Sequence, residues 1–566
     1  MKITKPGDLE KTKKEGLKQL SPAGIRITVG AASCGLAKGA DKVIKKLQSE
    51  VKKQKIKAEV VLVGCNGMCF AEPIVEVIRS GKPRITYGNV TTKDVSELLK
   101  AAKSGKIDED LVLMRHDEEK SALKSDSIKY KKGDLTKAYS AVKEYKRHEF
   151  FKDQLKLISK NSGTISPLSI EEYVALGGYG SLTKAITKMT PPNVIKEVTA
   201  SKLRGRGGGG FPAGTKWIAC QKADGDKKYI VCNGSEGDPE ISMHRSFLES
   251  DPHMIIEGMA IAGYAVGANE GYIYLNDRYL VALERVEAAI KQAKKAGLLG
   301  KKIMGTDFSF DLKVKRGGGA YVCGEETALL NSLEGTFGEP RPRPPYPAES
   351  GLFGKPTVVN NLETLSNIPA IIKKGGKWFS EIGSGSSKGT KIVALSGNVN
   401  QSCWVEVPLG TKISDIISTY GKGTESGKKI KAFQTGGPSG GILPAKSLNI
   451  KLDYNALTKA GSLLGSGGLL VMDEDTDMLD MAKFFTDFFV DESCGKCTTC
   501  REGTKQLKQI LSNIIDGKGK KGHINLIKRM SDGMAVNACC ALGKTAALPI
   551  TSVLEHFPEE IKGKLN

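Results

Sequence analysis

Three closely spaced cysteines are the residues of this sequence best suited to chemistry. Cys494, Cys497 and Cys500 form a C-x2-C-x2-C pattern. Thiolates at this spacing project to one side of a turn and can hold three corners of an iron–sulfur cubane, which a distant fourth cysteine completes. We expect Cys540 to be the fourth ligand, with Cys539 beside it as the lesser candidate. Structural zinc sites more often use two separated C-x2-C pairs, so the pattern favours a [4Fe–4S] cluster over zinc.

A glycine-rich stretch near the middle of the chain has the composition of a nucleotide-binding loop. Five of the six residues from 205 to 210 are glycine. Such a backbone can adopt positive φ and bring its N–H groups against a phosphate or a flat ring. Arg206 and Lys216 supply cationic donors, and Phe211 and Trp217 supply faces on which a ring could stack.

The same stretch matches G-x-G-x-x-G, but its surroundings do not match a Rossmann fingerprint. That fingerprint needs a buried strand just before it and an acidic residue about twenty positions later. Here Pro191 and Pro192 begin a segment whose apolar residues are spaced as on a helix face. We therefore expect a helix before the loop and a different kind of nucleotide site. A Rossmann site and a flexible linker remain the alternatives.

A second glycine-rich stretch, residues 316–327, combines close backbone approach with two carboxylates, Glu325 and Glu326. Carboxylates repel phosphate but accept hydrogen bonds from ribose hydroxyls or an amide. Four further short polar residues offer similar chemistry: Asn233, Glu236, Asn360 and Asn361. Each alone is more often a turn or a cap, but together with the first loop they predict a nucleotide pocket.

Three cysteines in the first hundred residues are also candidates for a metal site. Cys34 follows a strand predicted over 25–29, and Cys65 and Cys69 share a tight turn. This region resembles the thioredoxin-like [2Fe–2S] ferredoxin domain, whose cysteines follow C-x4-C and then C-x3-C. The first pair lacks one cysteine, because Val29 stands five places before Cys34. A [2Fe–2S] cluster with an unusual ligand and a structural domain without a cluster both remain open.

The elements that position these residues alternate between strands and helices. Strands predicted over 229–232 and 272–275 are separated by an apolar helix over 254–266, which indicates a layered α/β domain. Residues 390–450 read as shorter strands around one helix and suggest a small β-grasp module. The last hundred residues carry apolar stripes at helical spacing, which predict a helical core.

Composition excludes several classes of protein. The chain has 566 residues, 85 Lys and Arg against 63 Asp and Glu, and 39% hydrophobic residues, as in an ordinary multidomain globular protein. The excess positive charge is scattered, without a nucleic-acid-binding motif, so we expect no nucleic acid as partner. We find neither a signal peptide nor a stretch that could span a bilayer, and therefore expect a cytoplasmic protein. Twelve cysteines then point to metal or redox chemistry rather than disulfides.

One apparent hydrolase motif is best explained as a turn. Residues 437–441 match G-x-S-x-G, but Pro444 follows where a nucleophile elbow requires a helix. Neither of the later histidines, His523 and His556, lies in a supporting motif. The remaining cysteines lack partners at ligand spacing and are expected to pack in the core: Cys220, Cys232, Cys323 and Cys403.

From about residue 150 to its end the chain resembles a known family. Its three specific motifs occur in order at 204–212, 319–327 and 493–503. They are similar to those of the NADH-binding flavoprotein subunit of complex-I-type NADH dehydrogenases and of NAD-linked hydrogenases and formate dehydrogenases. The ferredoxin-like domain would then be an N-terminal fusion.

This resemblance implies a set of cofactor-binding residues. FMN would be held by Gly205, Arg206, Gly207, Lys216, Asn233, Glu236, Tyr321, Gly324, Asn360 and Asn361. NAD(H) would stack near Phe211, with Glu325 and Glu326 near the nicotinamide end and Arg343 and Tyr346 near the adenine end. Two positions, Ser235 and Asp238, depart from the family pattern. The run from 236 to 239 is closer to that of the hydrogenase-type members. Asp238 is kept among the cofactor-binding candidates.

The resemblance also implies a fold, a domain order and an activity. We expect an α/β multidomain chain: a thioredoxin-like ferredoxin domain (1–105), a linker (106–165), an FMN/NAD(H)-binding α/β domain (166–385), a β-grasp domain (386–455) and a helical [4Fe–4S] domain (456–566). The expected enzyme passes electrons between NAD(H), FMN and iron–sulfur clusters to partner iron–sulfur subunits of a hydrogenase- or formate-dehydrogenase-type complex, without a catalytic acid or base. An electron-bifurcating subunit and a metal-stabilised interaction scaffold are the alternatives.

Overall fold

The chain folds into two compact units, each built from discontinuous segments. The computed structural model describes residues 2–80, 82–116, 118–120, 127–129, 137–239, 241–425 and 427–565. The first unit comprises Met1–Met189, His244–Ile261 and Leu280–Asp311, and the second comprises Thr190–Met243, Ala262–Tyr279 and Leu312–Asn566. The predicted mixed α/β, multidomain architecture is confirmed, whereas the division into units does not follow the predicted boundary at residue 166.

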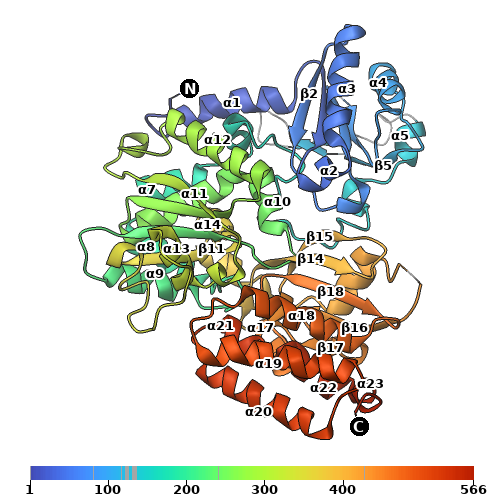
Figure 1. Cartoon of the computed structure of the whole chain (residues 1–566). Coiled ribbons are helices and arrows are strands. Elements are labelled where there is room, and N and C mark those ends of the chain that lie inside the picture. The colour runs from blue at the N-terminus through green and yellow to red at the C-terminus, as the bar shows by residue number, and fades with distance from the viewer. Residues whose placement is uncertain are drawn as a thin grey trace. The chain divides into compact units, whose positions relative to one another are not determined.

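A five-stranded sheet forms the N-terminal part of the first unit, drawn in blue to cyan in Figure 1. Its strand order is β2-β1-β3-β4-β5. Its strands are β1 (Ile25–Gly30), β2 (Ala58–Val63), β3 (Val75–Arg79), β4 (Lys82–Tyr87) and β5 (Val112–His116). The first two run parallel because α3 (Ala40–Lys53) crosses between them, and the others pair antiparallel. The apolar sides of the strands, of α3 and of α4 (Val95–Ser104) share one core.

Two elements of this unit differ from the prediction. Strand β5 lies within the predicted linker 106–165. Its apolar run is short and is flanked by charged residues, so the sequence did not indicate a strand. Met114 of this strand is nevertheless buried. Helix α1 (Asp8–Leu20) was not predicted, because its many lysines dilute the apolar face formed by Leu17 and Leu20. Parts of the predicted linker, 121–126 and 130–136, lie outside the described residues.

The rest of the first unit is helical. It contains α6 (Ile170–Ala175), α7 (Gly180–Lys188), most of α10 (Met243–Ser250), α11 (Pro252–Val266) as far as residue 261, and α12 (Leu280–Ala296). Ser169 caps α6 by accepting a hydrogen bond from the Glu172 N–H, as the capping-box spacing predicts. A buried ion pair ties this helix to the sheet, since Arg26 Nη1 lies 2.8 Å from Glu172 Oε1.

A four-stranded sheet supports the candidate nucleotide site in the second unit. Its order is β10-β9-β8-β11, with β8 (Tyr229–Gly234) parallel to β9 (Glu270–Asn276) and to β11 (Thr357–Asn361); β10 is Asp311–Gly317. Helices α9 (Ala213–Lys222), α13 (Glu326–Glu334) and α14 (Leu362–Lys374) belong to the same unit. Helix α8 (Pro191–Ala200) precedes the glycine-rich loop, so the predicted helix is confirmed and the Rossmann arrangement is excluded.

A second five-stranded sheet follows, in the order β15-β14-β18-β16-β17. Its strands are β14 (Thr390–Gly397), β15 (Cys403–Pro408), β16 (Ile430–Thr435), β17 (Ile442–Pro444) and β18 (Gly468–Asp473). The predicted helix is present as α16 (Ile413–Ile416), which continues as a π-helix over Ile417–Gly421. Since β18 pairs with both β14 and β16, this sheet extends beyond the predicted boundary at residue 455.

Helices make up the C-terminal part of the second unit. They are α17 (Tyr454–Lys459), α18 (Met478–Glu492), α19 (Thr498–Ile515), α20 (Lys521–Asn537), α21 (Ala541–Thr545), α22 (Leu548–His556) and α23 (Pro558–Lys562). Phe485, Phe489, Leu507 and Leu511 are buried in one core, as the apolar stripes predict. In the part of the chain that the structure describes, no helix has the length and apolarity that crossing a bilayer would require.

Candidate functional site

The glycine-rich loop is closed by its own backbone and is open on one side. The Gly205 N–H donates to the Phe211 carbonyl at 2.8 Å. Gly210 has φ of 60°, and a Cβ there would lie 2.8 Å from the Tyr454 ring, so packing requires a glycine. A Cβ on Gly209 would meet nothing within 4 Å. The loop therefore leaves space beside its backbone, as a cradle for a flat ligand requires.

The guanidinium of Arg206 is bound by carbonyls inside the protein. The residue is fully buried, and its guanidinium donates to the carbonyls of Thr390 at 3.1 Å and Lys388 at 2.5 Å. Its backbone N–H donates to Thr364 Oγ1 at 2.9 Å. This arrangement differs from the predicted role as a phosphate donor. Arg206 fixes the loop against β14 and the residues before it.

The carboxyl ends of two parallel strands bring the predicted asparagines together. Asn233 on β8 and Asn361 on β11 are register partners. Asn233 Nδ2 donates to the Gly324 carbonyl at 2.9 Å, which joins the second glycine-rich stretch to the strand end. Asn360 accepts a hydrogen bond from buried Trp217 at 2.8 Å, while Asn361 caps α14. Ligands of open α/β sheets bind at such strand ends.

Two cations and two carboxylates meet beside these strand ends. Lys216 Nζ lies 2.6 Å from Glu326 Oε2 and donates to the Val359 carbonyl at 3.0 Å. Arg343 contacts Glu326 at 3.2 Å and Glu325 at 3.6 Å. The resemblance places Arg343 and the two glutamates at opposite ends of NAD(H), whereas the structure places them in one ion-pair cluster. Their charges are therefore largely neutralised within the cluster.

Phe211 and Tyr346 present large aromatic side chains to solvent, with 55% and 54% of their surfaces exposed. Exposed aromatic faces are available for stacking on a flat ring.

Tyr321 connects neighbouring segments, and Asp238 packs closely against Gly437. Glu236 and Asp238 are buried, and a Cβ on Gly437 would lie 1.9 Å from Asp238 Oδ2. Tyr321 donates its N–H to Glu492 Oε2 at 2.7 Å, and its hydroxyl lies 3.0 Å from Ser439 Oγ. The second glycine-rich stretch is thus connected to the end of α18.

Sequence reasoning missed one buried ion pair in this region. Lys391 on β14 is buried and bonds Glu363 on α14, and it also donates to the Ser466 carbonyl at 2.6 Å. The Ile392 N–H donates to the second oxygen of Glu363 at 3.0 Å. Burial lowers the pKa of Lys391, while the Glu363 carboxylate opposes this effect. No spacing or motif signals the pair, because its members lie in different elements.

The C-terminal cysteines line a cavity in the second unit. It is lined by Val322, Pro340, Ser493, Cys494, Lys496, Cys497, Cys500, Cys539, Cys540 and Leu542. Cys497 is the N-cap of α19 and Cys540 is the N-cap of α21, so two helix N-termini open toward the cavity. Helix N-termini favour negative charge. Gly543 permits close packing, since a Cβ there would lie 3.0 Å from the Cβ of Cys500.

The donor set in this cavity fits an iron–sulfur cluster. Among the described residues, only the N-terminal cysteines have ligand atoms all within the 4.8 Å that suits one ion. The C-terminal set is therefore spread more widely, as a larger inorganic core requires. Burial raises the pKa of Cys500 to about 11, so its thiol stays protonated until a metal displaces the proton. Cys540 is buried and Cys539 is exposed.

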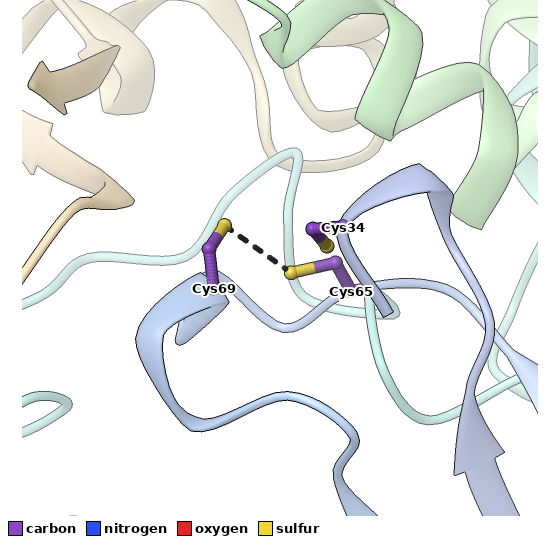
Figure 2. Close-up of side chains that lie close together, drawn as sticks. All are labelled: Cys34, Cys65 and Cys69. Carbon is purple, nitrogen blue, oxygen red and sulfur yellow. Dashed lines mark hydrogen bonds between the residues drawn. The ribbon is translucent and has the colours of Figure 1, made fainter. Parts of the chain in front are cut away.

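The three N-terminal cysteines converge in the first unit. Figure 2 shows the side chains of Cys34, Cys65 and Cys69 lying close together. Their sulfurs all lie within 4.8 Å of one another. Cys65 Sγ and Cys69 Sγ lie 3.8 Å apart, and Cys34 Sγ lies 4.0 Å from Glu72 Oε1. Sequence reasoning gave Glu72 no role; its position three residues after Cys69 was the available signal. Burial, together with the Cys34 thiolate, raises the pKa of Glu72 to about 8.

Comparisons with known proteins match the two segments of the second unit that contain these candidate sites. Residues 198–370 match the family described as the Nuo51 FMN-binding domain, and residues 480–564 match the NADH-ubiquinone oxidoreductase-F iron–sulfur binding region. The HndC subunit of the NADP-reducing hydrogenase of Solidesulfovibrio fructosivorans is 49% identical over 73% of this chain and 84% of its own length. The second F-type subunit of the NADH-quinone oxidoreductase of Rhizobium meliloti is 43% identical over 69% of this chain and 93% of its own length.

A solved structure shows similarity over nearly the whole chain. The crystal structure of an NAD+-reducing [NiFe]-hydrogenase in the air-oxidized state aligns with a TM-score of 0.64 and 26% identity, covering 99% of this chain and 88% of that one. The chain therefore belongs to the family of F-type subunits of NADH-linked oxidoreductases, with an FMN-binding domain followed by an iron–sulfur binding region.

Proposed function

We propose that this chain transfers electrons between NAD(H) and a [4Fe–4S] cluster by way of FMN, and exchanges them with an iron–sulfur subunit of a hydrogenase-type complex. One observation carries the proposal: a single turn, η5 (Tyr321–Gly324), reaches both candidate sites. The Gly324 carbonyl accepts a hydrogen bond from Asn233 at the strand ends, and Val322 lines the cysteine cavity. Two residues of chain span at most about 7 Å, so the sites are near neighbours.

For each group we propose a set of residues from the candidate sites of the second unit. For FMN we propose the loop residues Gly205 and Gly207, the backbone of Arg206, and the polar groups around the strand ends: Lys216, Asn233, Glu236, Asp238, Tyr321, Gly324, Asn360 and Asn361. For NAD(H) we propose Phe211, Glu325, Glu326, Arg343 and Tyr346. For the cluster we propose Cys494, Cys497, Cys500 and Cys540.

Bound FMN would supply the conversion between hydride, which carries two electrons, and the single electrons that a cluster exchanges. The protein's part is to bind FMN and NAD(H) and to orient them. The open side of the loop at Gly209 leaves room for a ring, and exposed Phe211 lies two residues away. The cluster of Lys216, Arg343, Glu325 and Glu326 offers polar contacts with little net charge. No side chain is needed as a general acid or base.

The partner is proposed from chemistry and from likeness to a hydrogenase subunit. A one-electron carrier in this chain requires another one-electron carrier to receive its electrons. HndC, which is 49% identical to this chain, is named as a subunit of an NADP-reducing hydrogenase. A neighbouring iron–sulfur subunit of such a complex is therefore the proposed partner.

The test uses the full chain, purified without oxygen and reconstituted with FMN, iron and sulfide. Flavin and cluster absorption should bleach on addition of NADH, and Cys497→Ser should lose about four irons per chain. Cys403→Ser is the matched control, because Cys403 is a buried cysteine outside the cavity. A protein that binds neither FMN nor four irons, or that does not respond to NADH, would be a scaffold and would refute the proposal.

A further inference from the structure

The three N-terminal cysteines are spaced as ligands of a single metal ion. The sulfurs of Cys34, Cys65 and Cys69 all lie within 4.8 Å of one another, and the last two are 3.8 Å apart. In a tetrahedral site with metal–sulfur bonds of about 2.3 Å, two ligand sulfurs lie about 3.8 Å apart. Among the described residues, no other group of three cysteine, histidine or acidic side chains has its ligand atoms this close together. One ion can therefore contact all three sulfurs after small side-chain movements.

The same spacing does not fit a [2Fe–2S] cluster. Such a cluster is held by four ligands, two on each iron. Ligands of different irons lie farther apart than ligands of one metal, because the irons and their bridging sulfides stand between them. Here all three sulfurs lie within one-metal distance, and Val29, five places before Cys34, supplies no sulfur. The three cysteines thus offer neither a fourth thiolate nor the separation that two irons require.

The ends of two parallel strands bring the cysteine-bearing segments together. Cys34 follows β1 and Cys65 follows β2, and these strands pair in parallel, so their carboxyl ends lie at the same edge of the sheet. The N–H and the hydroxyl of Ser33 donate to the buried Glu249 carboxylate at 2.7 and 2.6 Å. These two bonds fix the segment that carries Cys34.

Hydrogen bonds also fix the turn that carries the other two cysteines. The Gly67 N–H donates to Cys65 Sγ at 3.3 Å. Lys38 Nζ donates at 2.9 Å to the carbonyl of Phe70, the residue after Cys69, and so joins the two segments. Outer contacts of this kind orient the ligands of metal sites. The sulfurs are therefore held near one another before an ion binds.

We propose that the first unit holds one Zn²⁺ ion, bound by the thiolates of Cys34, Cys65 and Cys69, with water at the fourth position. Zn²⁺ takes tetrahedral sites with thiolate ligands, and a site with three protein ligands keeps water as the fourth. Cys34 and Cys69 are only partly buried, which leaves one side of the site open to water. Glu72 Oε1 lies 4.0 Å from Cys34 Sγ but is not within 4.8 Å of all three sulfurs, so Glu72 is a neighbour of the site and not a ligand. The thiol protons pass to solvent as the ion binds.

A zinc ion at this place is structural and lies outside the path of the electrons, because Zn²⁺ has no redox chemistry. It joins the segment after β1 to the turn after β2. Removal of zinc by a chelator should therefore lower the melting temperature of the full chain, and added Zn²⁺ should restore it. Bleaching by NADH should continue without zinc, since the flavin pocket and the C-terminal cysteines belong to the second unit.

The experiment uses the full chain, produced with both iron and zinc in the medium and purified without oxygen. Metal and sulfide analysis should give about one zinc, four irons and four sulfides per chain, with the iron in the C-terminal cubane. X-ray absorption at the zinc edge should show about three sulfurs at about 2.3 Å and one lighter ligand at about 2.0 Å. About six irons and six sulfides, or a chain without zinc, would overturn the proposed site. One zinc on three sulfurs without iron would support it and would refute only the C-terminal cluster.

Substitutions assign the ligands. Cys34→Ser should lose the zinc and keep about four irons per chain, because two thiolates remain at the site. Cys403→Ser is the matched control, a buried cysteine of the second unit, and should keep both metals. Glu72→Gln should also keep the zinc, and its loss there would overturn water as the fourth ligand. Wild-type zinc content in Cys34→Ser would overturn the cysteine site. The absorption spectrum of the wild-type protein decides the ligand set even if a variant fails to fold.

Discussion

Asn233 and Asn361 stand opposite each other at the carboxyl ends of two parallel strands, β8 and β11. The chain between them contributes β9, β10, the second glycine-rich stretch and α13. Through Asn233, which bonds the Gly324 carbonyl, this strand end joins the turn that leads to the cysteine cavity. The polar groups that sequence reasoning collected one by one thus meet because parallel strands end at the same edge of their sheet.

Two neighbouring glycines of the loop should respond differently to substitution. Gly209→Leu should leave the melting temperature unchanged but reduce the FMN content, because its side chain would enter the open side of the loop. Gly210→Ala should lower the free energy of unfolding by about 1–3 kcal/mol, because φ is 60° and Tyr454 lies close. Thermal melts and flavin-to-protein ratios measure both effects. Full flavin content in Gly209→Leu would argue against the loop as the cradle.

Arg206→Lys should act on stability rather than on phosphate binding. A lysine cannot donate to the Thr390 and Lys388 carbonyls together in the way that the guanidinium does. We expect the free energy of unfolding to fall by about 1.5–3 kcal/mol, the range for hydrogen bonds of charged groups. Denaturant titration measures this loss, and a flavin titration at low temperature tests affinity. Weaker flavin binding with unchanged stability would instead support a phosphate contact.

Arg343→Ala should weaken NADH binding by electrostatics. The substitution leaves Glu325 and Glu326 without one of their cations, so the negative phosphates of NADH would be repelled. We expect KM for NADH to rise by up to about tenfold with little change in kcat, and the difference to shrink at high salt. Lys355→Ala, which removes an exposed partner of Asp226, is the control and should change neither constant. An equal rise in KM for both variants would exclude a local effect.

The fourth ligand of the C-terminal cluster can be assigned by two adjacent substitutions. Cys540→Ser should lose the cluster, because Cys540 is buried at the N-terminus of α21. Cys539→Ser should keep about four irons per chain, since Cys539 is exposed at the edge of the cavity. Iron analysis and the EPR spectrum of the reduced protein distinguish the two. The reverse result would assign Cys539 as the ligand.

Acid should destabilise the first unit through Glu76. Although burial opposes it, attraction to Arg84 and hydrogen bonding to His116 and Thr86 lower the pKa of this carboxyl to about 2, from an ordinary value of 4.5. A carboxyl with a lowered folded-state pKa stabilises the fold above its unfolded pKa, and that stability is lost as the pH falls from 4.5 toward 2. Wild type should lose about 3 kcal/mol more over this range than Glu76→Gln. Parallel pH profiles of the two proteins would contradict the assignment.

Local patterns in the sequence predicted what depends on local spacing. The helix over Pro191–Ala200, the cysteine triplet and the buried stripe through Phe485 and Phe489 all follow from residue periodicity or side-chain chemistry, and the structure contains them. The direction of the Arg206 side chain could not be predicted, because its acceptors lie more than 180 residues away at Lys388 and Thr390. Periodicity carries no information about such distant carbonyls.

Two further features of the structure could not be predicted from the sequence, for related reasons. Strand β5 has only three apolar residues between charged neighbours, and it is defined by its pairing with β4 rather than by its own sequence. Glu72 follows Cys69 by three residues in the sequence, but acidic residues near turns usually face solvent. Only the folded backbone, with Gly30 and Gly35 leaving room for the carboxylate, turns this side chain inward.

The contacts of Arg206 and Lys391 constrain how this protein can be recombined with its relatives. Arg206 in the glycine-rich loop is bound to the carbonyls of Lys388 and Thr390, and Lys391 is bound to Glu363 at the start of α14. A chimera that exchanged the second five-stranded sheet alone would replace Lys391 and the backbone that Arg206 contacts, while Arg206 and Glu363 stayed from the original chain. The loop, the start of α14 and β14 are therefore best exchanged as one block in a hybrid subunit.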